Sequence, residues 1–203
     1  MPLLFLFDMD DVLYDYDWRA RMAGLTALTG LDLHELRQRW WHDDGEWAAE
    51  AGRFADADAY YSAFVAAIGT PVSVEEWVDN RRSAMTAWPA SIAAVERAAE
   101  LGQVSLLTNN GPLVQAHLAT IAPEIASVFG EHLRTTSYYG ARKPDVAVFD
   151  RVLTAYGADP ADVFFADDLR ENVAAAASRG ITAHLFTTPE KLLAAVEEFG
   201  ARA

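Results

Sequence analysis

Acidic, amide, hydroxyl and ammonium side chains follow four separate stretches of the sequence, and these groups are the ones suited to chemistry. The stretches, three of them strongly apolar, are 3–7, 104–107, 132–136 and 163–166. The groups that follow them are Asp8 with Asp10, Thr108 with Asn109, Lys143, and Asp167 with Asp168. Because the carboxyl ends of parallel strands meet along one edge of a sheet, we expect these groups to converge in one crevice.

Several carboxylates in one crevice repel one another, and burial increases that cost, so the predicted site requires a cation. The chain has no cysteine, and its histidines show no metal-ligand spacing. Oxygen ligands alone favour a hard ion, and Mg²⁺ also leaves room for waters and phosphate oxygens. We therefore expect a Mg²⁺ site among these aspartates.

The same residues predict phosphoryl transfer. With Mg²⁺ and Lys143 offsetting the charge, Asp8 can attack an anionic phosphoryl group in line and form an aspartyl-phosphate. Asp10, two residues later in an extended chain, projects from the same side and can act as general acid and then as general base. Thr108 and the backbone amide of Asn109 precede a predicted helix and suit phosphate oxygens.

Each group also has an ordinary interpretation. A D-x-D pair is common in solvated loops, and the pairs 108–109 and 167–168 could each cap a helix. Lys143 could be a surface lysine, but it is one of only two lysines among 16 basic residues. A compact ammonium in an arginine-rich chain favours a specific role. The prediction therefore depends on all four groups occurring in order.

Four segments resemble the ordered signature motifs of the haloacid dehalogenase-like superfamily, and the match in order and spacing covers nearly the whole chain. They are FDMDDVL (7–13), LLTNNG (106–111), GARKPD (140–145) and FFADDLRENV (164–173). The last two are most similar to the family's small sugar-phosphate phosphatases, such as the α-glucose-1-phosphate phosphatase type. The resemblance implies a phosphatase with Asp8 as nucleophile, Asp10 as acid and base, and Lys143 as charge clamp.

The resemblance also assigns the remaining site residues. It implies that Asp168 completes the Mg²⁺ site with Asp8 and the backbone carbonyl of Asp10. It makes Thr108 and Asn109 the phosphate binders, and Asp167 an outer ligand or a residue behind the ligands.

One position departs from the family, and several alternative functions stay open. Most members have glycine where this chain has Asp11, and strand alternation predicts that Asp11 points away from Asp10. The family's dehalogenases lack an aspartate at the position of Asp10, which favours phosphoryl transfer over dehalogenation. A phosphomutase is the main alternative. A non-catalytic phosphoacceptor module is disfavoured, because receiver domains lack an insertion of about 70 residues after the first strand, and a silent scaffold is disfavoured by the complete motif set.

The elements needed to position these groups follow a repeated order of helix, glycine and apolar strand. The three repeats are 89–101 with Gly102 and 104–107, then 145–156 with Gly157 and 163–166, then 169–179 with Gly180 and 181–185. This order predicts an α/β fold with a doubly wound, Rossmann-like parallel sheet.

Residues 14–87 interrupt this order, because they contain no convincing strand. Apolar residues fall at helical spacing in 19–28, 33–41, 57–68 and 74–85. We expect an all-helical cap at 14–87 inserted into a hydrolase core of 1–13 and 88–203, similar to the family's C1 cap; the alternative is that these helices only cover the sheet. Trp40 and Trp41 fit core packing better than substrate recognition.

The composition limits the partners. The net charge of −14, from 30 acidic and 16 basic residues, repels nucleic acid and anionic lipid surfaces. The N-terminal segment has no basic residues before its apolar run, and no run approaches the roughly 20 apolar residues of a membrane helix. We expect a cytoplasmic protein whose partner is a small phosphorylated metabolite; the substrate and the oligomeric state stay open.

Overall fold

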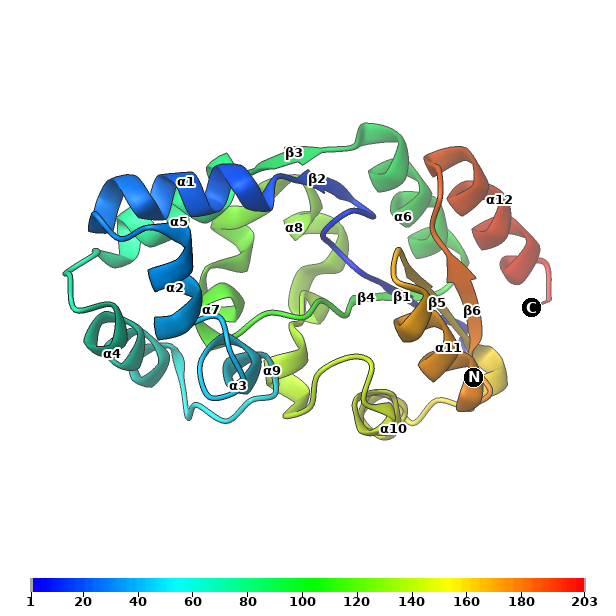
Figure 1. Ribbon diagram of the computed structural model, residues 1–203. Helices are drawn as coiled ribbons and strands as arrows, with labels where there is room; N and C mark the ends of the chain where they lie inside the picture. Colours follow the sequence, from blue (N-terminus) through cyan, green and yellow to red (C-terminus); the bar gives the residue numbers. More distant parts are fainter. Residues whose placement is uncertain (1, 203) are drawn as a thin grey trace.

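The computed structural model describes residues 2–202, and in that range a parallel sheet of four strands forms the centre of the molecule (Figure 1). In spatial order the strands are β4 (Gln103–Leu106), β1 (Leu4–Phe7), β5 (Val163–Asp167) and β6 (Thr182–Leu185). Every residue of β1 and β5 is buried, as expected for parallel strands covered on both faces. The predicted α/β fold with a doubly wound parallel sheet is confirmed.

Helices cover both faces of this sheet. The helices α6 (Pro89–Leu101) and α12 (Pro189–Gly200) pack together on one face, and α10 (Val146–Tyr156) and α11 (Arg170–Ser178) lie on the other. Side chains along β1 alternate between two cores: Phe5 and Phe7 join the core under α6 and α12, whereas Leu4 and Leu6 join the core under α10. The sheet is thereby fixed from both sides.

Five helices lie between β1 and α6 in the sequence. They are α1 (Trp18–Thr29), α2 (Leu33–Arg39), α3 (Glu46–Glu50), α4 (Ala57–Ile68) and α5 (Val74–Ser83). Capping boxes at Asp32 and Ser73 begin α2 and α5, since each side chain accepts from the backbone of a glutamate that reaches back. The helices α4 and α5 pack against α7 (Pro112–Ile121), so their apolar faces share one core with the sheet.

The expectation that 14–87 contains no strand is wrong at its two ends. Tyr14–Tyr16 forms β2 and Met85–Ala87 forms β3, and the two pair as an antiparallel ribbon. Each strand has three residues, which is too short for a period of two to be seen in the sequence. The chain enters and leaves the helical segment through this ribbon (Figure 1).

The strand expected around His132 to Thr136 is also wrong. The chain forms the 3-10 helix η1 (Gly130–His132) and then α9 (Thr136–Tyr139), and between them Thr135 makes an isolated parallel bridge to Thr108. Residues 131–137 are mostly polar and cannot cover both faces of a central strand. The bridge nevertheless holds the segment before Lys143 at the carboxyl edge of the sheet.

The other elements predicted in the sheet region agree with the structure to within one residue. The helices α7 and α8 (Pro123–Phe129) follow β4, and the short η2 (Pro160–Asp162) precedes β5. No helix in residues 2–202 is both long enough and apolar enough to cross a membrane.

Candidate active site

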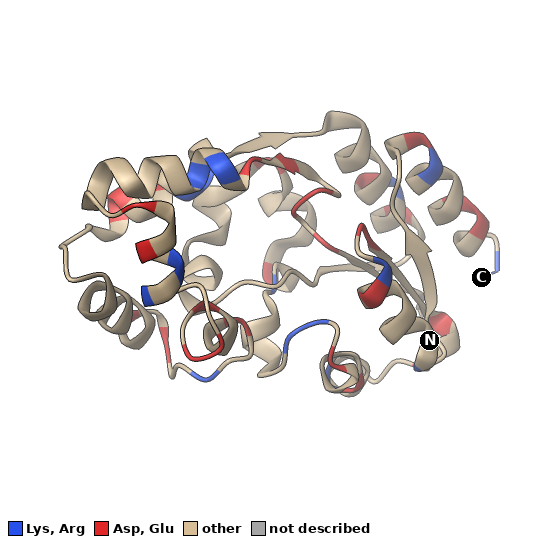
Figure 2. Ribbon diagram, viewed as in Figure 1, with Lys and Arg blue, Asp and Glu red and all other residues tan. Residues whose placement is uncertain are grey.

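A cavity of about 220 Å³ lies at the carboxyl ends of β1, β4 and β5. Six of the seven predicted site residues line it: Asp8, Asp10, Thr108, Asn109, Lys143 and Asp168. The seventh, Asp167, is fully buried behind the cavity wall. Acidic residues occupy the loops after β1 and β5, on the same side of the sheet (Figure 2). A larger cavity of about 690 Å³, near Trp47 and Arg142, includes no predicted site residue in its lining.

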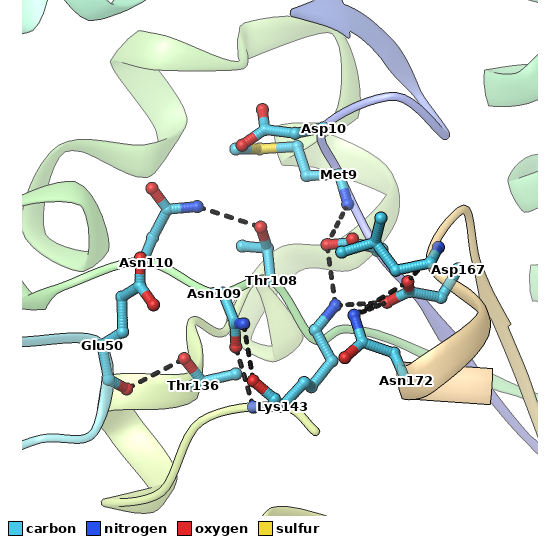
Figure 3. Close-up of polar contacts among 12 residues, drawn as sticks. Met9, Asp10, Glu50, Thr108, Asn109, Asn110, Thr136, Lys143, Asp167 and Asn172 are labelled. Carbon is cyan, nitrogen blue, oxygen red and sulfur yellow. Dashed lines mark hydrogen bonds and ion pairs between the residues drawn. The ribbon is translucent and has the colours of Figure 1, made fainter. Parts of the chain in front are cut away.

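Lys143 is the buried cation of this site (Figure 3). Its Nζ lies 3.0 Å from Oδ1 of Asp8 and 2.6 Å from Oδ2 of Asp167, and its side chain is 1% exposed. Burial acts to lower the pKa of Lys143, but the charges of Asp8 and Asp167 outweigh burial and leave that pKa raised. The lysine therefore keeps its positive charge between the two carboxylates.

Asp8 ends β1 and is held by the backbone. Its amide donates to the carbonyl of Ala166 at 3.0 Å, and its Oδ1 accepts from the amide of Met9 at 2.8 Å. Burial raises the pKa of Asp8 well above its usual range, Lys143 opposes this rise, and Asp167 and Asp10 add to it. Burial and the two neighbouring carboxylates together therefore outweigh the effect of Lys143 on the pKa of Asp8.

The donor set fits a divalent cation. Asp8, Asp167 and Asp168 each offer a carboxylate oxygen, and these oxygens lie within 4.8 Å of one another. Burial and the charge of Asp167 raise the pKa of Asp168 to about 6. Three carboxylates share one ammonium group, and oxygen-only donors suit a hard ion such as Mg²⁺.

Asp167 is largely occupied by other partners. Its Oδ1 accepts from the amide of Leu169 at 2.8 Å and from Nδ2 of Asn172 at 2.9 Å, while Oδ2 accepts from Lys143 (Figure 3). These contacts fit a residue that anchors Lys143 better than a direct metal ligand. Asn172, which the sequence analysis did not single out, lies within the fourth motif and lines the cavity.

The carboxylate of Asp10 points to an arginine that the sequence analysis missed. Nη2 of Arg81, on α5, lies 2.7 Å from both oxygens of Asp10, and the Arg81 side chain is fully buried. The sequence does not distinguish Arg81 from its neighbour Arg82, because an arginine on an amphipathic helix is normally solvated and the pattern therefore assigns both to the surface. Its location follows from the β2–β3 ribbon, which brings the end of α5 beside the loop after β1.

The amide and hydroxyl groups after β4 serve partly as supports. The side chain of Asn109 donates to the carbonyl of Lys143 and accepts from its amide, both at 2.9 Å. This reciprocal pair fixes the backbone of Lys143. The hydroxyl of Thr108 lines the cavity and accepts from Nδ2 of Asn110 at 2.9 Å, a contact that the sequence analysis did not anticipate (Figure 3).

The prediction that Asp11 points away from Asp10 is not supported, because both residues line the same cavity. The extended chain has ended at this point: Asp11 has a φ of 57° and its Oδ1 accepts from the amide of Tyr16. Strand alternation therefore does not apply. A positive φ also explains why glycine suits this position.

Comparisons with known proteins agree with this geometry. The profile of the haloacid dehalogenase-like hydrolases matches residues 3–180. A curated relative, "Phosphatase MT3486" from Mycobacterium tuberculosis, is 28% identical over 192 residues, covering 89% of this chain and 85% of the relative.

Two solved structures share the fold. An enzyme of the same family from Bacteroides thetaiotaomicron, in complex with magnesium and inorganic phosphate, has a TM-score of 0.72 at 17% identity and covers 92% of this chain and 95% of its own. A 2-haloacid dehalogenase from Pseudomonas syringae pv. tomato has a TM-score of 0.69 at 19% identity, covering 100% and 99%. Since both kinds of enzyme share this fold, the reaction has to be argued from the site residues.

Proposed function

We propose a phosphatase activity for this chain, which belongs to the haloacid dehalogenase-like hydrolase family. The substrate would be a small phosphomonoester, hydrolysed through an aspartyl-phosphate on Asp8 with Mg²⁺ as cofactor. The observation that carries the proposal is the convergence of Asp8, Asp10, Lys143 and Asp168 on one small cavity. The curated relative is named a phosphatase, and the solved structure that holds magnesium and phosphate supports the same activity.

Mg²⁺ would be held by Asp8, Asp168 and the backbone carbonyl of Asp10, with Asp167 behind them. When bound, it supplies the positive charge that lets an anionic phosphoryl group approach a carboxylate. The carboxylate cluster fits this role, because the single positive charge of Lys143 does not balance the negative charges of the cluster.

In the proposed reaction, an oxygen of Asp8 attacks phosphorus and the ester oxygen leaves. Asp10 gives a proton to that leaving oxygen, and Lys143 with the Thr108 hydroxyl holds phosphoryl oxygens. Water then attacks the aspartyl-phosphate while Asp10 accepts its proton, which releases phosphate and restores Asp8. The presence of Asp10 favours this course over dehalogenation, which needs no proton donor for its leaving halide.

We also propose that residues 14–87 act as a cap over a core formed by 1–13 and 88–203. The Arg81 side chain of α5 contacts Asp10 directly, which supports a cap that takes part in assembling the site. Such a cap would exclude bulk water while the aspartyl-phosphate forms.

The test measures phosphate release from p-nitrophenyl phosphate with and without Mg²⁺. We expect turnover that stops with a chelator and returns with added Mg²⁺, and we expect Asp8→Asn to abolish it. Asp15→Asn, an exposed aspartate on β2, is the matched control and should keep full activity. Retention of more than about a tenth of wild-type kcat by Asp8→Asn would overturn the covalent mechanism.

A further inference from the structure

The hydroxyl of Thr108 has one proton to donate, and a buried amide occupies its acceptor side. Thr108 follows β4, is 1% exposed and lines the candidate active site. Its Oγ1 accepts a hydrogen bond from Nδ2 of Asn110 at 2.9 Å. An amide nitrogen can only donate, so the hydroxyl has to be the acceptor in this contact. The proton of Thr108 is therefore left for a different partner.

That partner has to lie in the cavity. Within residues 2–202 the Thr108 hydroxyl donates to no other group, and the backbone carbonyl of Thr108 separately accepts from the amide of Thr136 at 2.8 Å. Asn110 approaches the hydroxyl from the left of the view, and Lys143 lies to the right (Figure 3). The proton points away from Asn110, because a hydroxyl separates its donor and acceptor directions. Phosphoryl oxygens only accept, so they match the proton that Thr108 has to offer.

Asn110 itself is firmly placed but does not reach the active-site cavity. It is 4% exposed, and it lines a neighbouring cavity of about 170 Å³ instead. The chain just after it is tightly packed, since a Cβ on Gly111 would lie 2.9 Å from the Cβ of Ala49. Rotation of the Thr108 hydroxyl would break its bond to a buried donor, which is costly. Asn110 can thus affect a bound phosphate only through Thr108.

We propose that Asn110 is a positioning residue, whose amide occupies the acceptor side of the Thr108 hydroxyl and thereby directs the Thr108 proton to a phosphoryl oxygen. This inference deepens the proposed phosphatase function and rests on it. The competing explanation is that the contact only stabilises the turn between β4 and α7. In that case, substitutions of Asn110 would change the melting temperature, but their effect on phosphate binding would not depend on the Thr108 hydroxyl.

The test is a double-mutant cycle of Asn110→Asp and Thr108→Val. An ionised aspartate can only accept, so Asn110→Asp should draw the Thr108 proton to itself and away from the phosphate. Thr108→Val removes the hydroxyl. The measurements, with Mg²⁺ present, are kcat/KM on p-nitrophenyl phosphate and the inhibition constant of inorganic phosphate. The introduced carboxylate also repels phosphate, and the effect of Asn110→Asp in the Thr108→Val background measures that repulsion alone.

We expect Asn110→Asp to lower kcat/KM and to weaken phosphate inhibition by about 10- to 100-fold more when the Thr108 hydroxyl is present than when it is absent. This is the effect of one hydrogen bond to a charged group. Asn110→Ala leaves the hydroxyl free to rotate, so its loss should be smaller, about 2- to 10-fold, and should also vanish in the Thr108→Val background. Thr120→Val, which removes an exposed hydroxyl on α7, is the matched control and should leave both constants unchanged.

Thermal melts show which variants stay folded, and the cycle with Asn110→Ala replaces the first one if Asn110→Asp does not fold. Equal effects of the Asn110 substitution with and without the Thr108 hydroxyl, in an enzyme that turns over, would overturn the positioning role. Absence of Mg²⁺-dependent turnover by the wild-type enzyme would instead refute the proposed function, and this inference with it.

Discussion

Glu50 links the helical segment to the loop that carries Lys143, and its ionisation should make the free energy of unfolding depend on pH. The Glu50 Oε2 lies 2.7 Å from Nε of Arg142, and its backbone carbonyl accepts from the Thr136 hydroxyl at 2.9 Å. Burial raises the pKa of Glu50 from 4.5 to about 7; Arg142 and Lys143 lower it, and Glu46 adds to the rise. The side chain is 12% exposed, so solvent screens this effect little.

The sign follows from the protons held in each state. Between pH 4.5 and about 7 the folded protein keeps a proton on Glu50 that the unfolded chain has released. The contribution of Glu50 to stability therefore falls as the pH rises through this window. A pKa difference of this size corresponds to a change of about 3 kcal/mol in the free energy of unfolding. This figure is an upper bound, because Glu50 is paired with Arg142.

Glu50→Gln removes the titration and keeps an acceptor for Arg142. The free energy of unfolding of both proteins is measured with urea at pH 5 and at pH 8. The difference, variant minus wild type, should be larger at pH 8 than at pH 5 by up to about 3 kcal/mol. Glu75→Gln, at an exposed position of α5, is the control and should show no such shift. If the stability difference between wild type and Glu50→Gln is the same at both pH values, the burial argument for Glu50 fails.

Three further changes test other contacts. Lys143→Ala leaves the fully buried Asp167 without its cation, so we expect a loss of about 3–5 kcal/mol in unfolding free energy together with loss of phosphatase activity. Arg81→Lys removes the guanidinium group that holds Asp10 in place. The kcat should fall by about 10-fold or more on glycerol phosphate but less on p-nitrophenyl phosphate, because the leaving group of the latter needs little protonation. Equal losses of kcat on both substrates would count against this positioning role. Gly52→Ala places a Cβ 2.7 Å from the Cα of Gly140 at a φ of 69°, so thermal melts should show destabilisation by about 1–3 kcal/mol, and an unchanged melting temperature would mean that this contact is loose.

The sequence predicted the parts of the site that strand order determines. Asp8, Thr108 and Asp168 follow apolar strands, and parallel pairing alone brings such positions to one edge of a sheet. Lys143 reached the same edge although its expected strand is wrong, because the Thr135–Thr108 bridge performs the same positioning.

The residues that were missed depend on tertiary contacts of the helical segment. Arg21 and Arg81 are buried polar residues on helices, and helical periodicity assigns such residues to solvent. The direction of Asp11 depends on a positive φ that a strand pattern does not encode. The ribbon strands were missed because pairing between residues about 70 positions apart, rather than local propensity, defines them.

The β2–β3 ribbon has a mechanical consequence. Both passages of the chain between the sheet and the five helices run through one hydrogen-bonded pair of strands, so neither strand can slip without the other. The ribbon therefore joins the sheet to the helical segment as one unit rather than as two separate linkers. Arg21 and Arg81 stand on helices just beyond its two ends, so the ribbon fixes where both guanidinium groups lie relative to Tyr16 and Asp10.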